Sequence, residues 1–159
     1  MSAVGFEAAG AADLAALGPR TLALRFASPG ARARGDTLAS ATARIARLLA
    51  AGYACAFVTE GGARVGYALW RAEPEDWRVL LRHFFIDEGA RGRGLGRRAF
   101  LAWRERFAPA GAAVTLDVIP DNDGAAAFWR AMGFDLMARR MILRPGEGPP
   151  DAPPRPLEA

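Results

Sequence analysis

The stretch from Arg91 to Arg98, RGRGLGRR, has the composition of an anion-binding loop. It sets three glycines among four arginines, between an apolar run that ends at Ile86 and a helix-like run that begins near Leu95. Glycines at such a junction let backbone N–H groups converge, and the first turn of a helix carries a partial positive charge. The stretch therefore predicts a site for an anion, most often a phosphate group.

Two common phosphate motifs do not fit this loop. Gly94-x-Gly96-x-x-Ala99 formally matches the dinucleotide-binding pattern, and Asp117 lies about 20 residues farther on. In that fold the first glycine follows directly on the strand, whereas Asp87–Arg93 intervene here, and too few residues follow for the remaining βαβ units. A Walker P-loop is excluded because the chain contains no lysine. A solvated glycine–arginine turn without a ligand remains the structural alternative.

The elements that must position this loop follow from the hydrophobic periodicity. Helices are predicted over Gly10–Leu17, from Asp36 or Thr37 to Gly52, over Leu95–Phe107 and over Gly124–Met132. Strands are predicted over Val4–Glu7, Ala54–Thr59, Arg64–Arg71, Val79–Ile86, Val114–Ile119 and Phe134–Leu143. The segment Leu22–Phe26 is ambiguous, and Ser28–Gly35 is turn-like.

This order of elements predicts one domain of the α/β (α+β) class. Antiparallel strands come first, and alternating strands and helices follow, which indicates a mixed, mainly antiparallel sheet flanked by helices. We place this domain at residues 1–144. Residues 145–159 form a proline-rich segment with little to bury, and we expect them to be disordered.

The composition is that of an ordinary globular protein, with 52% hydrophobic and 24% charged residues. No apolar run reaches the roughly 20 residues of a membrane span, and the N-terminus lacks the features of a signal peptide, so we expect a cytoplasmic protein without membrane contacts. One cysteine and one histidine cannot form a Cys/His cluster, which predicts no metal. All cationic side chains are arginine, as in GC-rich bacterial genomes, so the net charge of +4 does not by itself predict a nucleic-acid partner.

Motifs on both sides of the loop match a known family. After the strand end Phe84–Asp87, the chain carries Arg91-x-x-Gly94-x-Gly96, Leu116-Asp117-Val118 and Asn122-x-x-Ala125-x-x-x-Trp129-x-x-x-Gly133-Phe134. Over roughly Ala54–Leu143 this arrangement resembles the GNAT superfamily of N-acetyltransferases. The motifs occur together in the right order and spacing, which makes the resemblance more specific than either motif alone.

The resemblance implies a site for acetyl-CoA. In the family the pyrophosphate lies on backbone N–H groups of this loop and of the following helix, which implicates Arg91, Gly92, Arg93, Gly94, Leu95 and Gly96, with Arg97 as an added phosphate partner. Backbone groups of Phe85 and Ile86 would pair with the pantetheine arm. Asn122 and Trp129 match positions beside that arm, although Asn122, the only asparagine, can equally cap the next helix.

The resemblance also implies direct attack of an amine on acetyl-CoA in a ternary complex, which requires a proton acceptor. Asp117 matches an acidic position that is the base in some branches of the family, and strand alternation would put it on the opposite face from Leu116 and Val118. It could equally anchor the substrate amine. His83, the only histidine, lies on the strand beside the expected thioester and has a suitable intrinsic pKa. A hydrogen-bonded structural histidine is the alternative there.

Trp129 stands where the family usually has a tyrosine. An indole N–H can donate a hydrogen bond but cannot release its proton at ordinary pH. The departing thiolate could take its proton from water or from Tyr53 or Tyr67, or the protein could bind acyl-CoA without efficient transfer. General-acid help is worth about 10²–10⁴-fold rather than the whole rate enhancement, which favours a working enzyme.

The sequence therefore predicts an acetyl-CoA-dependent N-acetyltransferase that acts on a primary amine of a small molecule or peptide. The alternative, of a different functional class, is a non-catalytic or weakly catalytic acyl-CoA-binding sensor or interaction module of the same fold. Dimers are common in the family, so a homodimer is compatible with the resemblance, but no residue gives it independent support.

Overall fold

The computed structural model describes residues 2–27 and 35–138. The predicted turn over Ser28–Gly35 lies outside the described residues except for Gly35, and so do the proline-rich tail and the second half of the predicted strand Phe134–Leu143. Residues 134–138 of that stretch form no strand. The domain boundary at residue 144 stays a prediction.

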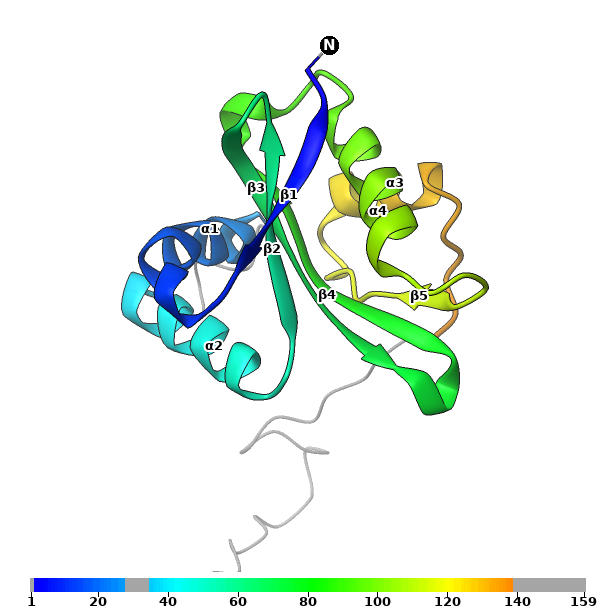
Figure 1. Cartoon of the computed structure of the whole chain (residues 1–159), viewed down its shortest axis with the longest axis horizontal. Helices are drawn as coiled ribbons and strands as arrows, with labels where there is room; N and C mark the ends of the chain where they lie inside the picture. Colours follow the sequence, from blue (N-terminus) through cyan, green and yellow to red (C-terminus); the bar gives the residue numbers. More distant parts are fainter. Residues whose placement is uncertain (1, 28–34, 139–159) are drawn as a thin grey trace, which may run out of the picture.

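Five strands form one sheet in the order β1-β2-β3-β4-β5 (Figure 1). Antiparallel pairing joins β1 (Val4–Ala9), β2 (Ala54–Glu60), β3 (Ala63–Glu73) and β4 (Arg78–Ile86) in sequence order. The last strand, β5 (Ala113–Thr115), runs parallel to β4.

Helices cover both faces of this sheet (Figure 1). One face carries α1 (Leu14–Phe26) and α2 (Leu38–Ala50), and the other carries α3 (Leu95–Phe107) and α4 (Asp123–Ala131). Short 3-10 turns are η1 (Ala11–Asp13), η3 (Pro74–Asp76) and η4 (Glu88–Ala90). The predicted α/β (α+β) class with a mixed, mainly antiparallel sheet is confirmed.

The first helix is longer than the sequence predicts. The turn η1 and helix α1 replace the predicted helix Gly10–Leu17, and the ambiguous segment Leu22–Phe26 forms the last turns of α1. Leu17, Thr21 and Leu24 recur at helical spacing and pack toward the sheet. This burial outweighs the low helix propensity of the Gly-Pro pair in the middle of α1.

Helix α2 begins as predicted. The Thr37 hydroxyl oxygen accepts the backbone N–H of Ser40 (3.1 Å), and the Ser40 hydroxyl oxygen accepts the N–H of Thr37 (2.9 Å). This reciprocal cap satisfies two amides of the first turn. Ala41 and Ile45 are buried on the face that packs toward the sheet.

Apolar side chains on both faces of the sheet form the core. The face toward α1 and α2 contains Leu17, Ile45, Phe57, Tyr67, Leu69 and Phe85. The face toward α3 and α4 contains Trp70, Val79, Leu81, Phe100 and Trp103. Because both faces are covered, the central strands are apolar at successive positions. Within residues 2–27 and 35–138, every helix is too short or too polar to span a membrane.

Strand β4 carries a bulge at Arg82. Leu69 of β3 pairs with His83, whereas Trp70 pairs with Leu81, so Arg82 has no partner on β3. Such an extra residue bends and twists its strand. β4 pairs with β5 only over Arg78–Leu80, and beyond that point the two strands diverge (Figure 1).

This divergence corrects the prediction of a strand over Val114–Ile119. The strand ends at Thr115, and residues 116–119 have no strand conformation. β4 turns away at its bulge, so these residues have no neighbouring edge to pair with. The alternation that would place Asp117 opposite Leu116 and Val118 therefore does not apply.

The close approach of β3 to the end of β4 depends on Gly66. A Cβ atom at this position would lie 2.2 Å from the Phe85 carbonyl oxygen and 3.1 Å from the Ile86 Cα atom. Backbone atoms cannot rotate away, so we expect Gly66→Ala to lower the free energy of unfolding by about 1–3 kcal/mol, as overpacking does. Urea denaturation followed by circular dichroism measures the loss.

Gly89→Ala is the matched control. A Cβ atom at Gly89 would meet no atom within 4 Å, so this variant should change the free energy of unfolding by less than about 0.5 kcal/mol. Equal losses in both variants would show that the predicted clash does not exist.

Candidate functional site

The loop between β4 and α3 depends on two glycines with left-handed backbone. Gly92 has φ 79° and Gly94 has φ 70°, and Gly94 is the N-cap residue of α3. Residues with a Cβ atom rarely adopt this conformation. These two glycines turn the chain from the end of β4 into α3 within a few residues.

The N-terminus of α3 presents free backbone donors. The first helical bond runs from the Arg98 N–H to the Gly94 carbonyl oxygen (3.2 Å), and no side chain of the described residues caps the helix. The N–H groups of Leu95, Gly96 and Arg97 precede that bond and have no partner within the helix. Three converging N–H groups at the positive end of a helix form an anion site.

The position of α3 is fixed by packing at its first turn. Leu95 is buried in a cluster with Val58, Ile86 and Ala99. A Cβ atom at Gly96 would lie 3.4 Å from the Phe128 ring, so Gly96 permits the close contact between α3 and α4. The anion site therefore rests on a rigid support.

The four arginines of the loop divide into two kinds. Arg91 donates from Nε to the Ile86 carbonyl oxygen (2.8 Å) and lies over the Phe85 ring. Arg98 donates to Glu60 (2.7 Å) and to the Ser2 carbonyl oxygen (3.0 Å). These two hold the loop to the sheet.

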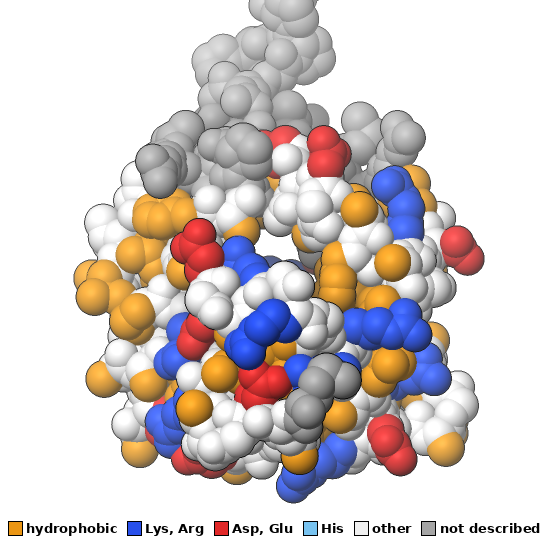
Figure 2. Space-filling view, turned by 90° about the horizontal axis from the view of Figure 1, so that it is seen from above, with side chains coloured by type: hydrophobic (Ala, Val, Ile, Leu, Met, Phe, Trp, Pro, Cys, Tyr) orange, Lys and Arg blue, Asp and Glu red, His pale blue; other side chains and the backbone are white. Residues whose placement is uncertain are grey.

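Arg93 and Arg97 are the arginines available to a ligand. Arg93 reaches Glu60 only at 3.4 Å, and its side chain is 61% exposed. Arg97 is exposed and forms no ion pair with any residue that the structure describes. Seen from the end of the molecule that carries the loop, arginine side chains lie on both sides of a central hollow (Figure 2).

The edge of β4 beyond Leu80 faces away from β3 without a strand partner in the described part of the chain. This open edge runs from the bulge at Arg82 to Ile86, where the loop begins. An extended ligand with amide groups can pair with such an edge. Phe85 and Ile86, which the resemblance to the family assigns to the pantetheine arm, lie at its end.

Asp117 lies across the divergence from this edge. Its carboxylate accepts a hydrogen bond from Arg82 of the bulge, with an Oδ2 to Nη1 distance of 3.3 Å. The sequence analysis missed Arg82, although a single arginine in the otherwise apolar run before His83 was the available signal. The pair places a carboxylate and a guanidinium at the point where the sheet splits.

His83 is buried in a chain of hydrogen bonds. Its Nδ1 lies 3.0 Å from the Tyr67 hydroxyl, which lies 3.0 Å from the Thr21 hydroxyl. Burial, and then the charges of Arg44, Arg82 and Arg25, lowers the pKa of His83 to about 3. Burial likewise raises the pKa of Tyr67. The structural alternative for His83 thus has direct geometric support.

Asn122 caps helix α4, which is one of the two roles expected for it. Its Oδ1 accepts the backbone N–H of Ala125 (3.1 Å). Trp129, one residue after Phe128 on the same helix, contacts the rings of Phe84, Phe100, Phe128 and Phe134, with centroid distances between 4.8 and 5.6 Å. The indole therefore belongs to the aromatic packing between α3, α4 and β4.

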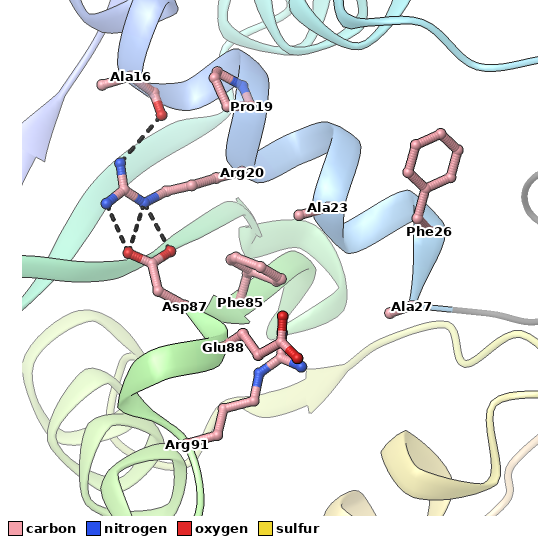
Figure 3. A pocket seen from close by; sticks show the side chains of 10 residues that line it. All are labelled: Ala16, Pro19, Arg20, Ala23, Phe26, Ala27, Phe85, Asp87, Glu88 and Arg91. Atoms are coloured by element: carbon pink, nitrogen blue, oxygen red, sulfur yellow. Dashed lines mark hydrogen bonds and ion pairs between the residues drawn. The ribbon is translucent and has the colours of Figure 1, made fainter.

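A pocket of about 690 Å³ lies on the other side of the loop, against α1 (Figure 3). The end of β4, the turn η4 and one side of α1 form its walls, which comprise Ala16, Pro19, Arg20, Ala23, Phe26, Ala27, Phe85, Asp87, Glu88 and Arg91. Arg20 joins these walls through three hydrogen bonds to the Asp87 carboxylate (2.9, 3.2 and 2.7 Å). No sequence signal identified this pair.

The chemical groups of these residues are suited to binding an acyl-CoA. The uncapped amides of α3 and the exposed Arg93 and Arg97 suit a pyrophosphate, and the open edge of β4 suits the amide groups of a pantetheine arm. No three His, Cys, Asp or Glu side chains are grouped as a metal site would need, among the residues that the structure describes.

Comparison with known proteins finds a curated relative. N-alpha-acetyltransferase RimI of Mycobacterium tuberculosis (strain ATCC 25618 / H37Rv) is 39% identical over 84 residues, which are 50% of this chain and 51% of the relative. The match thus spans about half the length of this curated relative.

Solved structures share the fold at lower identity. An aminoglycoside N-acetyltransferase, AAC(6')-Iy, in complex with CoA has a TM-score of 0.65 and 18% identity, over 91% of this chain and 95% of that one. A ribosomal-protein-alanine N-acetyltransferase from Brucella melitensis biovar Abortus 2308 has a TM-score of 0.64 and 13% identity, over 89% and 99%. At these identities the likeness concerns the fold alone.

The family model of the acetyltransferase (GNAT) family matches residues 25–134. This range includes the β4–α3 loop, the open edge of β4, Asp117 and the capped helix α4. It covers more than half of the chain, and it confirms the family that the two motifs predict. The chain belongs to the acetyltransferase (GNAT) family.

Proposed function

We propose that this protein transfers an acetyl group from acetyl-CoA to a primary amine of a small molecule or peptide. The observation that carries the proposal is the uncapped N-terminus of α3 in line with the open edge of β4. CoA offers the complementary features, a pyrophosphate next to a pantetheine arm with two amide groups. Family membership and the CoA complex of the aminoglycoside N-acetyltransferase support the same ligand.

In this proposal the loop residues bind different parts of the ligand or hold the loop in place. The N–H groups of Leu95, Gly96 and Arg97 bind the pyrophosphate, and the side chains of Arg93 and Arg97 add positive charge. Arg91 acts by holding the loop through its bond to the Ile86 carbonyl oxygen. When bound, acetyl-CoA supplies a thioester, whose acyl carbon is open to attack by an amine.

Asp117 is the proton acceptor that we favour. Only a neutral amine attacks, so the ammonium form must first lose a proton. The Asp117 carboxylate lies at the split of the sheet, half-exposed and oriented by Arg82. His83 binds no proton near neutral pH because its pKa is lowered to about 3, which makes it a weak base.

The departing thiolate takes its proton from water in this proposal. The indole of Trp129 cannot release a proton at ordinary pH. Tyr67 is fully buried between Thr21 and His83, and burial raises its pKa. Tyr53 precedes β2 and lies against Arg71 and the cluster under α2.

Amine-dependent release of CoA tests the transferase directly. The full chain is incubated with acetyl-CoA and a panel of primary amines, and free thiol is measured. We expect release with at least one amine, and we expect Asp117→Asn to lower kcat by about 10²–10⁴-fold, as loss of a general base does. Binding of CoA without release for any amine would instead identify an acyl-CoA-binding module.

Gly94→Asp and Gly94→Asn test the pyrophosphate site. The two side chains have the same shape and both tolerate left-handed backbone, so they differ mainly in charge. We expect Gly94→Asp to weaken CoA binding about ten-fold or more relative to Gly94→Asn, because its carboxylate would face the pyrophosphate. Isothermal titration calorimetry measures both affinities for CoA. Equal affinities would show that the loop does not bind the pyrophosphate.

The pH dependence of stability tests the state of His83. Its pKa is about 3 in the folded chain, against 6.5 for the free side chain, so between these pH values only the unfolded chain binds the proton. The free energy of unfolding should therefore fall as the pH drops from 6.5 toward 3, by up to about 1.4 kcal/mol per pH unit from this residue.

Urea denaturation across this range, compared with His83→Gln, isolates that contribution, because glutamine does not titrate. The imidazole also gives a single set of NMR signals, since the chain has one histidine. Chemical shifts that titrate near pH 6.5 in the folded protein would contradict the buried, neutral state.

A further inference from the structure

Three arginines from three elements lie near enough to His83 for their charges to act on its pKa. Arg25 comes from the last turn of α1, Arg44 from the middle of α2, and Arg82 from the bulge of β4. The charges of all three lower the pKa of His83, and the pKa of Arg44 is lowered by its burial and then by Arg25 and Arg82. We call Arg25, Arg44 and Arg82 the arginine cluster.

Two members of the arginine cluster have carboxylate partners. Arg25 donates from Nε to Asp36 (2.8 Å), and Arg82 donates to Asp117 (3.3 Å). Asp36 is also the carboxylate whose charge raises the pKa of Arg44. Each carboxylate thus already has an arginine to which it is bonded.

Arg44 has no such partner. Its Nε is shielded from solvent and has no hydrogen-bond acceptor, and no ion pair joins its guanidinium to any residue in the described ranges. An arginine stays charged in proteins, and a buried N–H donor without an acceptor costs free energy. Among the residues that the structure describes, the cluster therefore has one positive charge more than its carboxylates balance, next to a donor that requires an acceptor.

One member of the arginine cluster, Arg82, lies where the acceptor amine must arrive. Arg82 follows the last paired residue of β4 by two positions, so it stands where β4 and β5 begin to diverge. Asp117, the proposed base, is bonded to Arg82 itself. The reaction that we propose takes place along this open edge, and Arg25 and Arg44 belong to α1 and α2, which cover one face of the sheet.

We propose that the arginine cluster binds a carboxylate of the acceptor, so that the substrate is a small amine with a carboxylate near its reactive nitrogen, such as an amino acid. This inference rests on the proposed transferase function. Carboxylate oxygens would supply the acceptors that Arg44 lacks, in the paired geometry that guanidinium groups favour. A polycationic amine, such as an aminoglycoside, would meet the excess positive charge of the cluster at the same place.

Matched amines test the preference without any mutation. L-Alanine and L-alaninamide differ in the carboxylate, and rates are compared at equal concentrations of unprotonated amine because their amine pKa values differ. We expect kcat/KM to be about ten-fold or more higher for alanine, as expected for hydrogen bonds to a charged group. A third acceptor, aspartyl-alaninamide, shows whether an acidic N-terminal residue of a peptide can supply the carboxylate instead.

Arg44→Gln should abolish this preference and leave the rate with alaninamide unchanged. Arg104→Gln is the matched control, because Arg104 is exposed on α3, on the other face of the sheet, and loses the same charge. Equal rates for alanine and alaninamide in the wild-type protein, with unchanged rates in Arg44→Gln, would overturn the inference and leave the transferase intact.

Binding measured without turnover separates the two proposals. The CoA-bound protein is titrated calorimetrically with N-acetylalanine and with N-acetylalaninamide. Binding of the carboxylate compound alone, lost in Arg44→Gln but not in Arg104→Gln, supports the carboxylate site even if no amine releases CoA. Equal binding of the two compounds, or binding that does not depend on Arg44, contradicts the site whatever the activity.

Discussion

The unequal pairing of the two edges of β4 is the constraint on which the rest of the structure depends. One edge is paired with β3 along the strand except at the bulge residue Arg82, and the other is paired with β5 over three residues. The bulge at Arg82 causes the change, since it bends β4 away from β5. A fully paired strand would leave no free edge for a ligand, and an unpaired one would be an exposed edge open to aggregation.

The two-sided core makes this split sheet stable. Aromatic side chains on one face and a mixed cluster under α1 and α2 on the other hold β4 in place after its partner β5 has ended. The unpaired part of β4 therefore keeps its position without a strand partner on that edge. Polar groups collect where the cores stop, which is why Arg82 and Asp117 lie near one another at the start of the gap.

The loop and the family could be predicted from the sequence because local chemistry determines them. Gly92 and Gly94 need left-handed backbone, and the motif around Asn122 fixes a helix cap, so short segments carry the information. The length of α1 and the end of β5 could not be predicted, because burial against distant segments decides both. The pairs Arg20–Asp87 and Arg82–Asp117 join residues 67 and 35 positions apart, and no spacing rule connects them.

Arg20 limits how far α1, β3 and the loop after β4 can move relative to one another. Its guanidinium bonds to the Ala16 carbonyl oxygen of α1, the Arg64 carbonyl oxygen of β3 and the Asp87 carboxylate that precedes the loop. One planar guanidinium thus connects the helix, the sheet and the loop, and the single ammonium group of a lysine could not replace it. Widening the pocket beside α1 would break several of these bonds at once, so the pocket should admit ligands by their size and not by adapting to them.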